Sequence, residues 1–523
     1  MQLSIEALQL KKNGLIYMVT LIAIMIIAAK FPMMNDETYY IAFSKNLQTS
    51  YVDHPPFVSY LNIAQTMLGL HSPLIERSLV IVLHLLSTCF LMAIVYHHCA
   101  KDSDLAIKLR LTFLIAYLVP IFGFFSIFIL PDTGLIFSLS LLLWVADRVI
   151  SNHHLSFRNA VELGIGLGIG LLSKYHILPL GGGILCGLFL DLLIHSKFRW
   201  SDVMKMLMSV LIGLMIASPM FIWNINNHFA SFVFQLQHGL NAKQWHWKDS
   251  LVFIVVSTLY LTPWFTFKFL KQGLWTKRHA YLIIPVCSLS LIFLISSLRT
   301  HVLPQWISPA FWLLIPYTVI YCGQAGVGSL ITWCKYTALI WIPLVIALSF
   351  PGGMWNLKPF IQWIHGNTPN SWCTLFWEEL PVLVQQDAIL APLIGTALHQ
   401  NPPPGCVEKK PIIGTFKRIW ASQLEYHQVF PGAKILNLEQ NSSNFYLWRD
   451  QWADYAHCNI LFIAESTDDL APVLANILTV KHQYRLQGIG DYPALHLQVL
   501  TGTLNDKNTL ENLQKNLLIA PHY

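Results

Sequence analysis

The sequence predicts a polytopic α-helical membrane protein of about 11 spans, followed by a C-terminal extracytoplasmic α/β domain. The first observation is composition. Of 523 residues, 54% are hydrophobic and 11% are charged, whereas a soluble domain carries about 25% charged residues. The second is that apolar segments of nearly spanning length recur up to residue 350. The third is that shorter strand and helix patterns alternate after it. We therefore expect a membrane domain at 1–350 and an α/β domain at 351–523.

Each predicted span is an apolar segment close to the roughly 20 residues that cross a bilayer. The segments are 14–32, 74–97, 109–130, 134–150, 160–173, 177–195, 204–222, 250–267, 280–298, 307–323 and 333–350. The first follows Lys11 and Lys12 and lacks a small-residue cleavage site, so we interpret it as an uncleaved signal anchor. With the N-terminus in the cytoplasm, the inner ends hold about twice as many Lys and Arg residues as the outer ends. An odd number of spans then places the residues after Phe350 outside.

The predicted α/β domain begins after a polar stretch that contains Pro402-Pro403-Pro404-Gly405. Strands are expected at 411–415, 433–438, 459–464 and 494–500, and helices at 418–427 and 468–480. Three cysteines, Cys373, Cys406 and Cys458, fall in this part of the chain. Because three is an odd number, at most one disulfide can form among them.

Several function classes are disfavoured by the sequence. The net charge of +6 is small for this length, and no basic patch interleaved with aromatic residues is present, so no nucleic-acid partner is expected. No P-loop and no H-E-x-x-H zinc motif is present. The glycines from Gly164 to Gly170 lie in an apolar segment without the nucleotide-binding spacing, which favours close packing of helices.

The predicted topology places the polar loops on one face of the membrane. These loops are Asp36–Glu37, Asp53–His54, Asp132, Lys174–His176, Asn224–Lys248 and Arg299–Trp306. The topology is derived from the Lys and Arg count, which does not itself require these polar loops to lie on the same face. Their shared location predicts a single extracytoplasmic active site.

Asp36 and Glu37 are the sharpest of these features, because carboxylates beside a hydrocarbon boundary are costly and are functional candidates by default. An enzyme that transfers a group to a hydroxyl or amine needs a carboxylate that takes the acceptor proton, or one that holds a divalent metal ion at the leaving phosphate. Adjacent carboxylates point in different directions, so one of the two is expected to face the substrate. The alternative is structural, with Asn35 or Asp36 capping a helix that starts at Thr38.

Short motifs follow one another in a specific order along nearly the whole chain. They are Asp36–Glu37, Tyr39–Tyr40, Tyr51–Pro56, Pro131–Thr133, Ser173–His176, Ser218–Asn224, Ser231–Leu236, Ser297–Arg299, Gln305–Trp306, Ala421–Tyr426 and Tyr446–Trp448. In this order the chain resembles the polyprenyl-phosphate-sugar glycosyltransferases of the GT-C fold. That superfamily includes the protein O-mannosyltransferases and the lipid A aminoarabinose transferases, and the C-terminal motifs resemble its bacterial family 39-type members.

The resemblance implies catalytic roles for Asp36, Glu37 and Asp132. Asp36 would be the general base or a metal-positioning carboxylate with Glu37 beside it, and Asp132 would orient the acceptor or a metal. The aminoarabinose transferases usually carry an acid-Lys-Pro sequence where this chain has Asp53-His54-Pro55. Here His54 is charged only when protonated and could instead be a metal ligand. Asp36, Asp53 and His54 are therefore the candidate ligands of a divalent metal ion.

Substrate-binding roles are expected for Asp53 and His54 and for a group of residues in later loops. Those residues are Lys174, Tyr175, Arg299, His301 and Trp306. Lys174 and Arg299 would bind the phosphate that leaves as the anomeric bond breaks. The alternative is that these two side chains snorkel at the membrane interface, and that His301 and Trp306 belong to an interfacial belt.

We expect an inverting glycosyltransferase in a bacterial inner membrane, with its active site on the periplasmic side. The donor would be a sugar on a polyprenyl monophosphate, and the acceptor a lipid A or lipopolysaccharide, polysaccharide or protein. One alternative is a secondary transporter or lipid flippase without transferase activity, which would place charges at mid-membrane depth and use repeated, broken helices. Another is a receptor or assembly protein without catalysis.

Overall fold

The computed structural model divides the chain into two compact units, one formed by Met1–Phe31 with Thr49–Leu348 and the other by Pro32–Gln48 with Ser349–Tyr523. We call them the helical unit and the C-terminal unit. The described residues are 2–195, 199–240, 247–263, 279–300, 302–349, 373–388, 390–399, 406, 410–415, 417–438, 451–465, 470–489 and 492–519. His301, the Tyr446–Trp448 motif, the Pro402–Gly405 stretch and residues 241–246 of the Asn224–Lys248 loop lie outside them.

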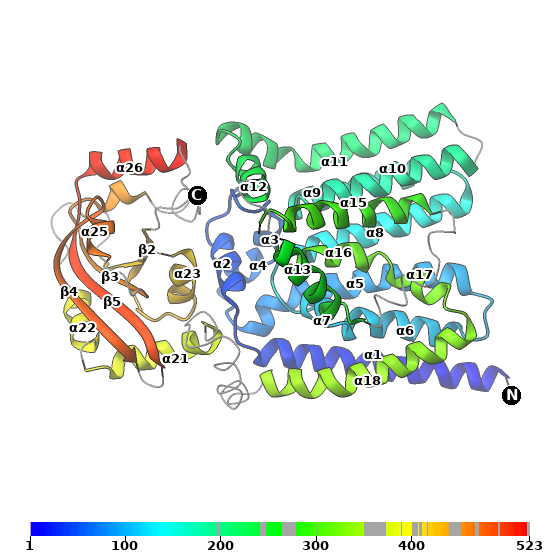
Figure 1. Ribbon diagram of the computed structural model, residues 1–523, viewed down its shortest axis with the longest axis horizontal. Coiled ribbons are helices and arrows are strands. Elements are labelled where there is room, and N and C mark those ends of the chain that lie inside the picture. Colours follow the sequence, from blue (N-terminus) through cyan, green and yellow to red (C-terminus); the bar gives the residue numbers. More distant parts are fainter. Residues whose placement is uncertain are drawn as a thin grey trace. The chain divides into compact units, whose positions relative to one another are not determined.

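The helical unit is built from long helices joined by short ones (Figure 1). Its elements are α1 (Gln2–Lys30), α3 (Phe57–Tyr60), α4 (Ile63–Leu68), α5 (Pro73–Cys99), α6 (Leu105–Leu118), α7 (Pro120–Phe125), α8 (Asp132–Asn152), α9 (Phe157–Ser173), α10 (Ile177–His195), α11 (Trp200–Asn226), α12 (Ala230–Leu240), α13 (Trp247–Tyr260), α15 (Ala280–Ser297), η2 (Pro304–Ile307), α16 (Ser308–Trp312), α17 (Ile315–Ile320) and α18 (Gly323–Ser349). The long helices α8, α9, α10, α11 and α15 pack side by side.

Six helices among the described residues are long and apolar enough to cross a membrane. They are Lys11–Lys30, Pro73–Cys99, Asp132–Asn152, Ile177–Ile194, Trp200–Asn226 and Ala280–Ser297. The fold is therefore that of a mostly helical, multi-pass membrane protein. The larger number of about 11 spans stays a prediction, and the expected span 250–267 extends beyond the described residues.

Two of the expected spans are not single helices, and prolines explain the breaks. Segment 109–130 is divided between α6 and α7 because Val119, which precedes Pro120, adopts an extended backbone with ψ 122°. Segment 307–323 is divided because Pro309 and Pro316 each stand in the first turn of a new short helix. Hydropathy alone does not reveal these breaks.

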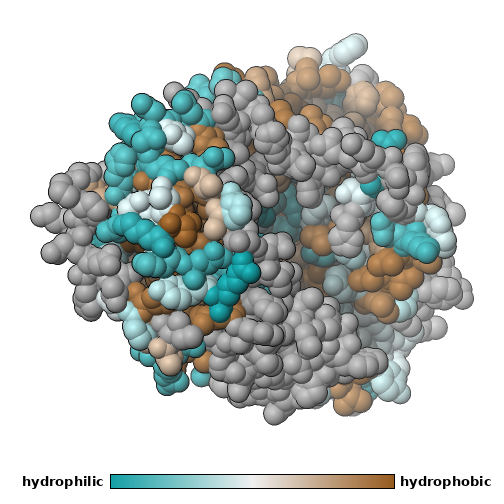
Figure 2. All heavy atoms as spheres, turned by 60° about the vertical axis from the view of Figure 1, so that its left-hand side comes forward, coloured by the Kyte–Doolittle hydropathy of each residue, from teal (hydrophilic) through white to brown (hydrophobic). Residues whose placement is uncertain are grey.

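Apolar side chains cover much of the outer surface of the helical unit. On α11, Leu207, Leu211 and Met215 are exposed, with spacing that places them on one face of the helix. Figure 2 shows hydrophobic, brown patches on this unit, whereas hydrophilic, teal residues predominate on the described surface of the C-terminal unit. An apolar outer face of this kind is what contact with lipid requires.

The glycines of α9 allow three helices to pack closely. A Cβ atom on Gly164 or Gly168 would overlap Ile212 or Ile216 of α11, and one on Gly166 would overlap Leu142 of α8. The predicted role of this glycine series in helix packing is thus confirmed.

The end of α1 is held by a fully buried arginine on α5. Arg77 donates hydrogen bonds to the carbonyl oxygens of Ala28 and Phe31 at 2.7 and 2.8 Å. These carbonyls lie at the helix C-terminus, where intrahelical donors are missing. Arg77 therefore fixes the point at which the chain leaves the helical unit for the segment Pro32–Gln48.

The C-terminal unit contains a mixed five-stranded sheet in the order β2-β1-β3-β5-β4. Strands β1, β2 and β3 are parallel, whereas β5 is antiparallel to both β3 and β4. Its elements are α2 (Asn35–Ser44), α21 (Cys373–Gln386), α22 (Leu390–His399), β1 (Ile412–Thr415), α23 (Arg418–Tyr426), β2 (Lys434–Asn437), η4 (Trp452–Tyr455), β3 (Asn459–Glu465), α25 (Ala471–Leu474), β4 (Leu478–Ile489), β5 (Tyr492–Leu504) and α26 (Lys507–Ile519).

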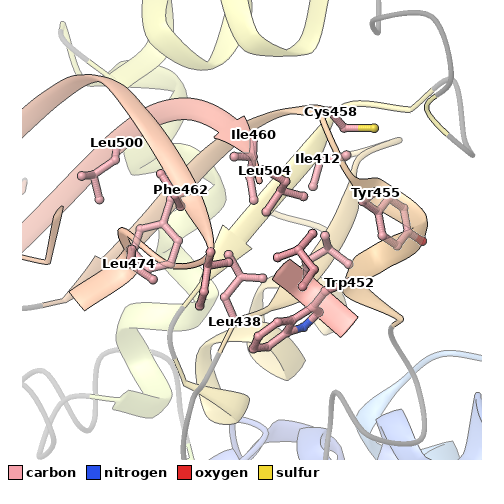
Figure 3. Close-up of a cluster of buried hydrophobic side chains, with 14 of the residues drawn as sticks. Ile412, Leu438, Trp452, Tyr455, Cys458, Ile460, Phe462, Leu474, Leu500 and Leu504 are labelled. Atoms are coloured by element: carbon pink, nitrogen blue, oxygen red, sulfur yellow. The ribbon is translucent and has the colours of Figure 1, made fainter. Parts of the chain in front are cut away.

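One face of this sheet carries a compact apolar core (Figure 3). Ile460 and Phe462 of β3 and Leu500 of β5 meet the fully buried Trp452 of η4 in this cluster. The Trp452 indole donates a hydrogen bond of 3.1 Å to the carbonyl of Asn437, so its polar atom is satisfied. This core gives the unit its own hydrophobic interior.

The expected helix at 468–480 is wrong in its second half. The structure has only the four-residue α25 there, and β4 begins at Leu478. The apolar residues of this segment are compatible with a helix, but the β-branched pair Thr479-Val480 lies at the start of a long strand that pairs with β5. The expected strand at 494–500 is likewise longer, Tyr492–Leu504.

A disulfide joins Cys406 to Cys458 across 52 residues of sequence. It ties the segment before β1 to the segment before β3. This bond agrees with the prediction that at most one disulfide forms among Cys373, Cys406 and Cys458.

Candidate functional site

The Asp36–Glu37 pair lies on the first turn of α2, which packs on α23 within the C-terminal unit. Gln423 Nε2 donates to Asn35 Oδ1 at 2.9 Å, and the Thr38 and Ser422 hydroxyls lie 3.3 Å apart. Lys45 and Glu425 form an ion pair at 3.2 Å. Two of the sequence motifs, almost 390 positions apart, are therefore parts of one contact.

The two adjacent carboxylates have different surroundings. Glu37 is fully buried, and its Oε2 accepts a hydrogen bond of 3.1 Å from the backbone N–H of Met34 at the start of α2. Asp36 is exposed on the same turn. Glu37 thus stabilises the helix N-terminus, whereas Asp36 on the same turn is exposed to solvent.

In the helical unit, Asp132 and Lys174 form a buried ion pair. Lys174 Nζ lies 2.8 Å from Asp132 Oδ2 and 3.0 Å from Oδ1, with side chains only 7% and 9% exposed. Asp132 is the first residue of α8, and Lys174 follows the last residue of α9. Because these antiparallel helices pack together, residues at the start of one and the end of the other meet.

The loop after Lys174 connects the pair to the Asp53–His54 loop. The Tyr175 hydroxyl hydrogen-bonds with Ser231, and the backbone carbonyl of Asp53 accepts a hydrogen bond of 2.7 Å from Gln235 on α12. Burial, followed by the charge of Asp53, raises the pKa of Tyr175 to about 12, partly offset by the hydrogen bonds to Ser231 and Asn224. Tyr175 is therefore a neutral hydrogen-bonding group at physiological pH.

His176 is fully buried beside these residues. Its burial is the main cause that holds its pKa well below the usual value, and the electrostatic interactions with Lys174 and with His54, when His54 is protonated, act in the same direction. The ring is therefore neutral at pH 7. Its Nε2 is buried and makes no hydrogen bond within the part of the chain that the structure describes, so the residue has hydrogen-bonding capacity to spare.

Trp306 of η2 reaches the same cluster. Its ring centroid lies 6.3 Å from that of His176 and 5.8 Å from that of Phe293. Arg299 is half-buried just beyond the C-terminus of α15. The structure thus brings Asp53, His54, Asp132, Lys174, Tyr175 and Trp306 to one end of the helical unit.

Some of the residues in this cluster could not be selected from the sequence. Ser231, Gln235 and His176 lie inside or beside the motifs, but nothing in their spacing shows that they contact Tyr175, hold the Asp53 backbone or retain an unsatisfied nitrogen. Only the packing of α9, α10 and α12 reveals these roles. Asp36 belongs to the other unit, so its association with Asp132 stays a prediction.

Comparisons with known proteins found one matching family model and two similar solved structures. Residues 53–223, about a third of the chain, match the family of dolichyl-phosphate-mannose-protein mannosyltransferases. The crystal structure of ArnT from Cupriavidus metallidurans in the apo state is similar over 95% of this chain and 98% of its own, with a TM-score of 0.60 and 14% identity. The same protein bound to undecaprenyl phosphate is similar over 93% and 97%, with a TM-score of 0.57 and 12% identity. No curated protein sequence matches significantly.

The chain therefore has the fold of the ArnT structures. The resemblance predicted from the order of the motifs is thereby confirmed. The segment that matches the family model contains five of the predicted site residues, namely Asp53, His54, Asp132, Lys174 and Tyr175. Asp36, Glu37, Arg299, His301 and Trp306 lie outside it.

Gly134 sets the spacing of α8 and α9 beside the Asp132–Lys174 pair, and this yields a test. A Cβ at this position would overlap Ser173 Oγ and the Phe57 ring. Gly134→Ala is expected to lower the free energy of unfolding by about 1–3 kcal/mol and to reduce the transfer activity proposed below, because it separates the two helix ends. Thermal denaturation and a transfer assay measure both. Gly182→Ala is the matched control, since its Cβ would meet nothing within 4 Å; equal behaviour of the two variants would contradict the prediction.

Proposed function

We propose that the protein is an integral-membrane glycosyltransferase that moves a sugar from a polyprenyl monophosphate to an extracytoplasmic acceptor. The observation that carries this proposal is the buried Asp132–Lys174 pair at the helix ends, next to Tyr175 and the Asp53–His54 loop. The similarity to ArnT, which has been crystallised with undecaprenyl phosphate, supports a polyprenyl carrier as donor. The alternative prediction of a transporter or flippase gains no support from these comparisons.

Lys174 is proposed to bind the phosphate of the donor. A Lys ammonium has three donors, and two of them are directed at the Asp132 carboxylate. The third remains for a phosphate oxygen. Asp132 would hold the ammonium in place through both of its oxygens, so the positive charge is already positioned when negative charge develops on the leaving phosphate. Arg299 and Trp306 would complete this side of the site.

Asp36 is proposed to activate the acceptor. Its exposure leaves the carboxylate able to accept a proton from an acceptor hydroxyl or amine as that group attacks the anomeric carbon. Glu37 would act through the position of α2, since it stabilises the helix that carries Asp36. A divalent metal ion remains a candidate cofactor, with Asp36, Asp53 and His54 as its proposed ligands; bound there, it would polarise the departing phosphate.

We place the active site on the periplasmic side of a bacterial inner membrane, in a chain of about 11 spans. The Cys406–Cys458 disulfide supports this location for the C-terminal unit, because disulfides persist in oxidising compartments. The proposed acceptor is lipid A or lipopolysaccharide, a polysaccharide or a protein.

Mass spectrometry of envelope lipids and glycans from cells with and without the protein tests the proposal. Loss of the protein is expected to remove one sugar from an envelope molecule and to raise the amount of the matching polyprenyl-phosphate sugar. Re-expression of the unaltered chain should restore the sugar on the envelope molecule and the normal amount of the carrier. The mass difference would identify the transferred sugar and the molecule that accepts it. Unchanged envelope molecules and an unchanged carrier pool would contradict the proposal.

A further inference from the structure

A second polar cluster lies at the other end of α8, away from the proposed active site. Asp147 is 15 positions after Asp132, so the two are about 22 Å apart along the helix axis. The Asp147 carboxylate, only 3% exposed, meets the last turn of α5: His98 Nε2 lies 2.8 Å from its Oδ1 and His97 Nδ1 lies 3.3 Å from its Oδ2. The proposed transfer reaction uses none of these three residues.

The charge of Asp147 requires compensation, because an ionised carboxylate is costly to bury. Its ion-pair partners among the described residues are the two histidines, which carry charge only when protonated. Arg148, the next residue, pairs instead with Glu162. A cation bound by both imidazoles and the carboxylate would provide the missing charge without requiring protonated histidines.

The geometry is close to that of such a cation site. The three candidate ligand atoms, one from each residue, all lie within 4.8 Å of one another. Tetrahedral zinc with bonds of about 2.0–2.1 Å separates neighbouring ligand atoms by about 3.3–3.4 Å. His97 Nδ1 and Asp147 Oδ2 are 3.3 Å apart, whereas the 2.8 Å between His98 Nε2 and Asp147 Oδ1 would have to lengthen by about 0.5 Å when the ion binds. Two imidazoles and one carboxylate are ligands that divalent zinc accepts, and a water molecule would complete four-coordination.

Two tyrosines orient the carboxylate for this purpose. Tyr317 of α17 donates to Asp147 Oδ1 at 2.9 Å, and Tyr281 of α15 approaches the same oxygen at 3.3 Å. The two hydroxyls are themselves 2.6 Å apart. Hydrogen bonds from outer groups to a ligating carboxylate are typical of metal sites, and here they hold Oδ1 while Oδ2 stays directed at His97.

An ion could enter from a cavity of about 590 Å³ that is lined by His97 and Asp147 and also by Tyr96, Trp144 and Arg148. His97 and His98 are 46% and 27% exposed, so two of the three ligands are accessible while the third is buried. We propose that His97, His98 and Asp147 form a zinc site that ties α5 to α8 at this end of the helical unit, with Tyr281 and Tyr317 as positioning residues.

Metal content of the purified full-length protein tests the proposal. After chelator treatment and reloading with Zn²⁺, elemental analysis is expected to find one Zn²⁺ per chain fewer in His97→Gln and His98→Gln than in the unaltered protein. Co²⁺ in its place should give the absorption bands of a tetrahedral nitrogen and oxygen site. Tyr317→Phe should keep the site with affinity reduced by about 10–100-fold, as for other outer-shell changes.

Two control variants separate this site from other histidines. His154→Gln alters an exposed histidine just beyond the end of α8, and His54→Gln alters the candidate ligand of the proposed active site; both should retain the ion at His97 and His98. The proposal fails if the unaltered protein and His98→Gln bind the same amount of Zn²⁺. The three residues would then form a hydrogen-bonded cluster without an ion. It fails equally if His154→Gln loses the same ion.

Discussion

Replacing Lys174 by Met is expected to reduce sugar transfer by at least about 10²–10³-fold, as for the loss of one preorganised group that stabilises developing charge. The same change should lower the free energy of unfolding by about 3–5 kcal/mol, because it leaves the buried Asp132 carboxylate without its partner. Reconstituted protein with a labelled polyprenyl-phosphate sugar gives the rate, and thermal denaturation gives the stability.

The double variant Lys174→Met with Asp132→Leu separates a chemical from a structural role. An apolar pair of similar volume often replaces a buried ion pair without loss of stability, so the double variant should regain most of the lost stability. If Lys174 binds the phosphate, transfer stays lost. If transfer returned together with stability, the pair would be a structural link between α8 and α9, and the proposed role of Lys174 would be wrong.

Features that depend on local sequence could be predicted well. The apolar segments located the long helices, and the glycine series on α9 was assigned to packing because its spacing suits no phosphate loop. In the C-terminal unit, the predicted strands at 411–415, 433–438 and 459–464 lie within one or two residues of the observed ones. In each case the prediction rests on a residue periodicity or spacing that lies within a single helix or strand.

Features that depend on contacts between distant segments could not be predicted. The packing of α2 on α23 includes contacts such as the hydrogen bond between Gln423 and Asn35. Neither motif contains a signal that predicts this contact. The His97, His98 and Asp147 cluster joins two helices that the sequence represents only as apolar runs, and it was not among the predicted metal ligands. Prolines such as Pro120 divide a run that hydropathy treats as continuous.

Substitution of Asp36 should change mainly the transfer rate, whereas substitution of the adjacent Glu37 should change mainly the free energy of unfolding. Asp36→Asn is expected to lower the transfer rate by about 10²–10⁴-fold, the usual contribution of a general base. Its effect on the free energy of unfolding should stay within about 0.5 kcal/mol, because the side chain is exposed. Binding of polyprenyl phosphate should also be unchanged, since Lys174 is the residue proposed to bind the donor phosphate.

Glu37→Ala is the matched comparison one residue away. It removes the hydrogen bond to the Met34 backbone and leaves a buried space, so it should lower the free energy of unfolding by about 1–3 kcal/mol. Glu37→Gln keeps an oxygen that can accept this bond and should recover much of that loss. Transfer rates, denaturation midpoints and donor binding, measured on all three variants, test the assignment. A stable Asp36→Asn variant with full transfer would remove Asp36 from the reaction, and the acceptor would then have to be activated by another group.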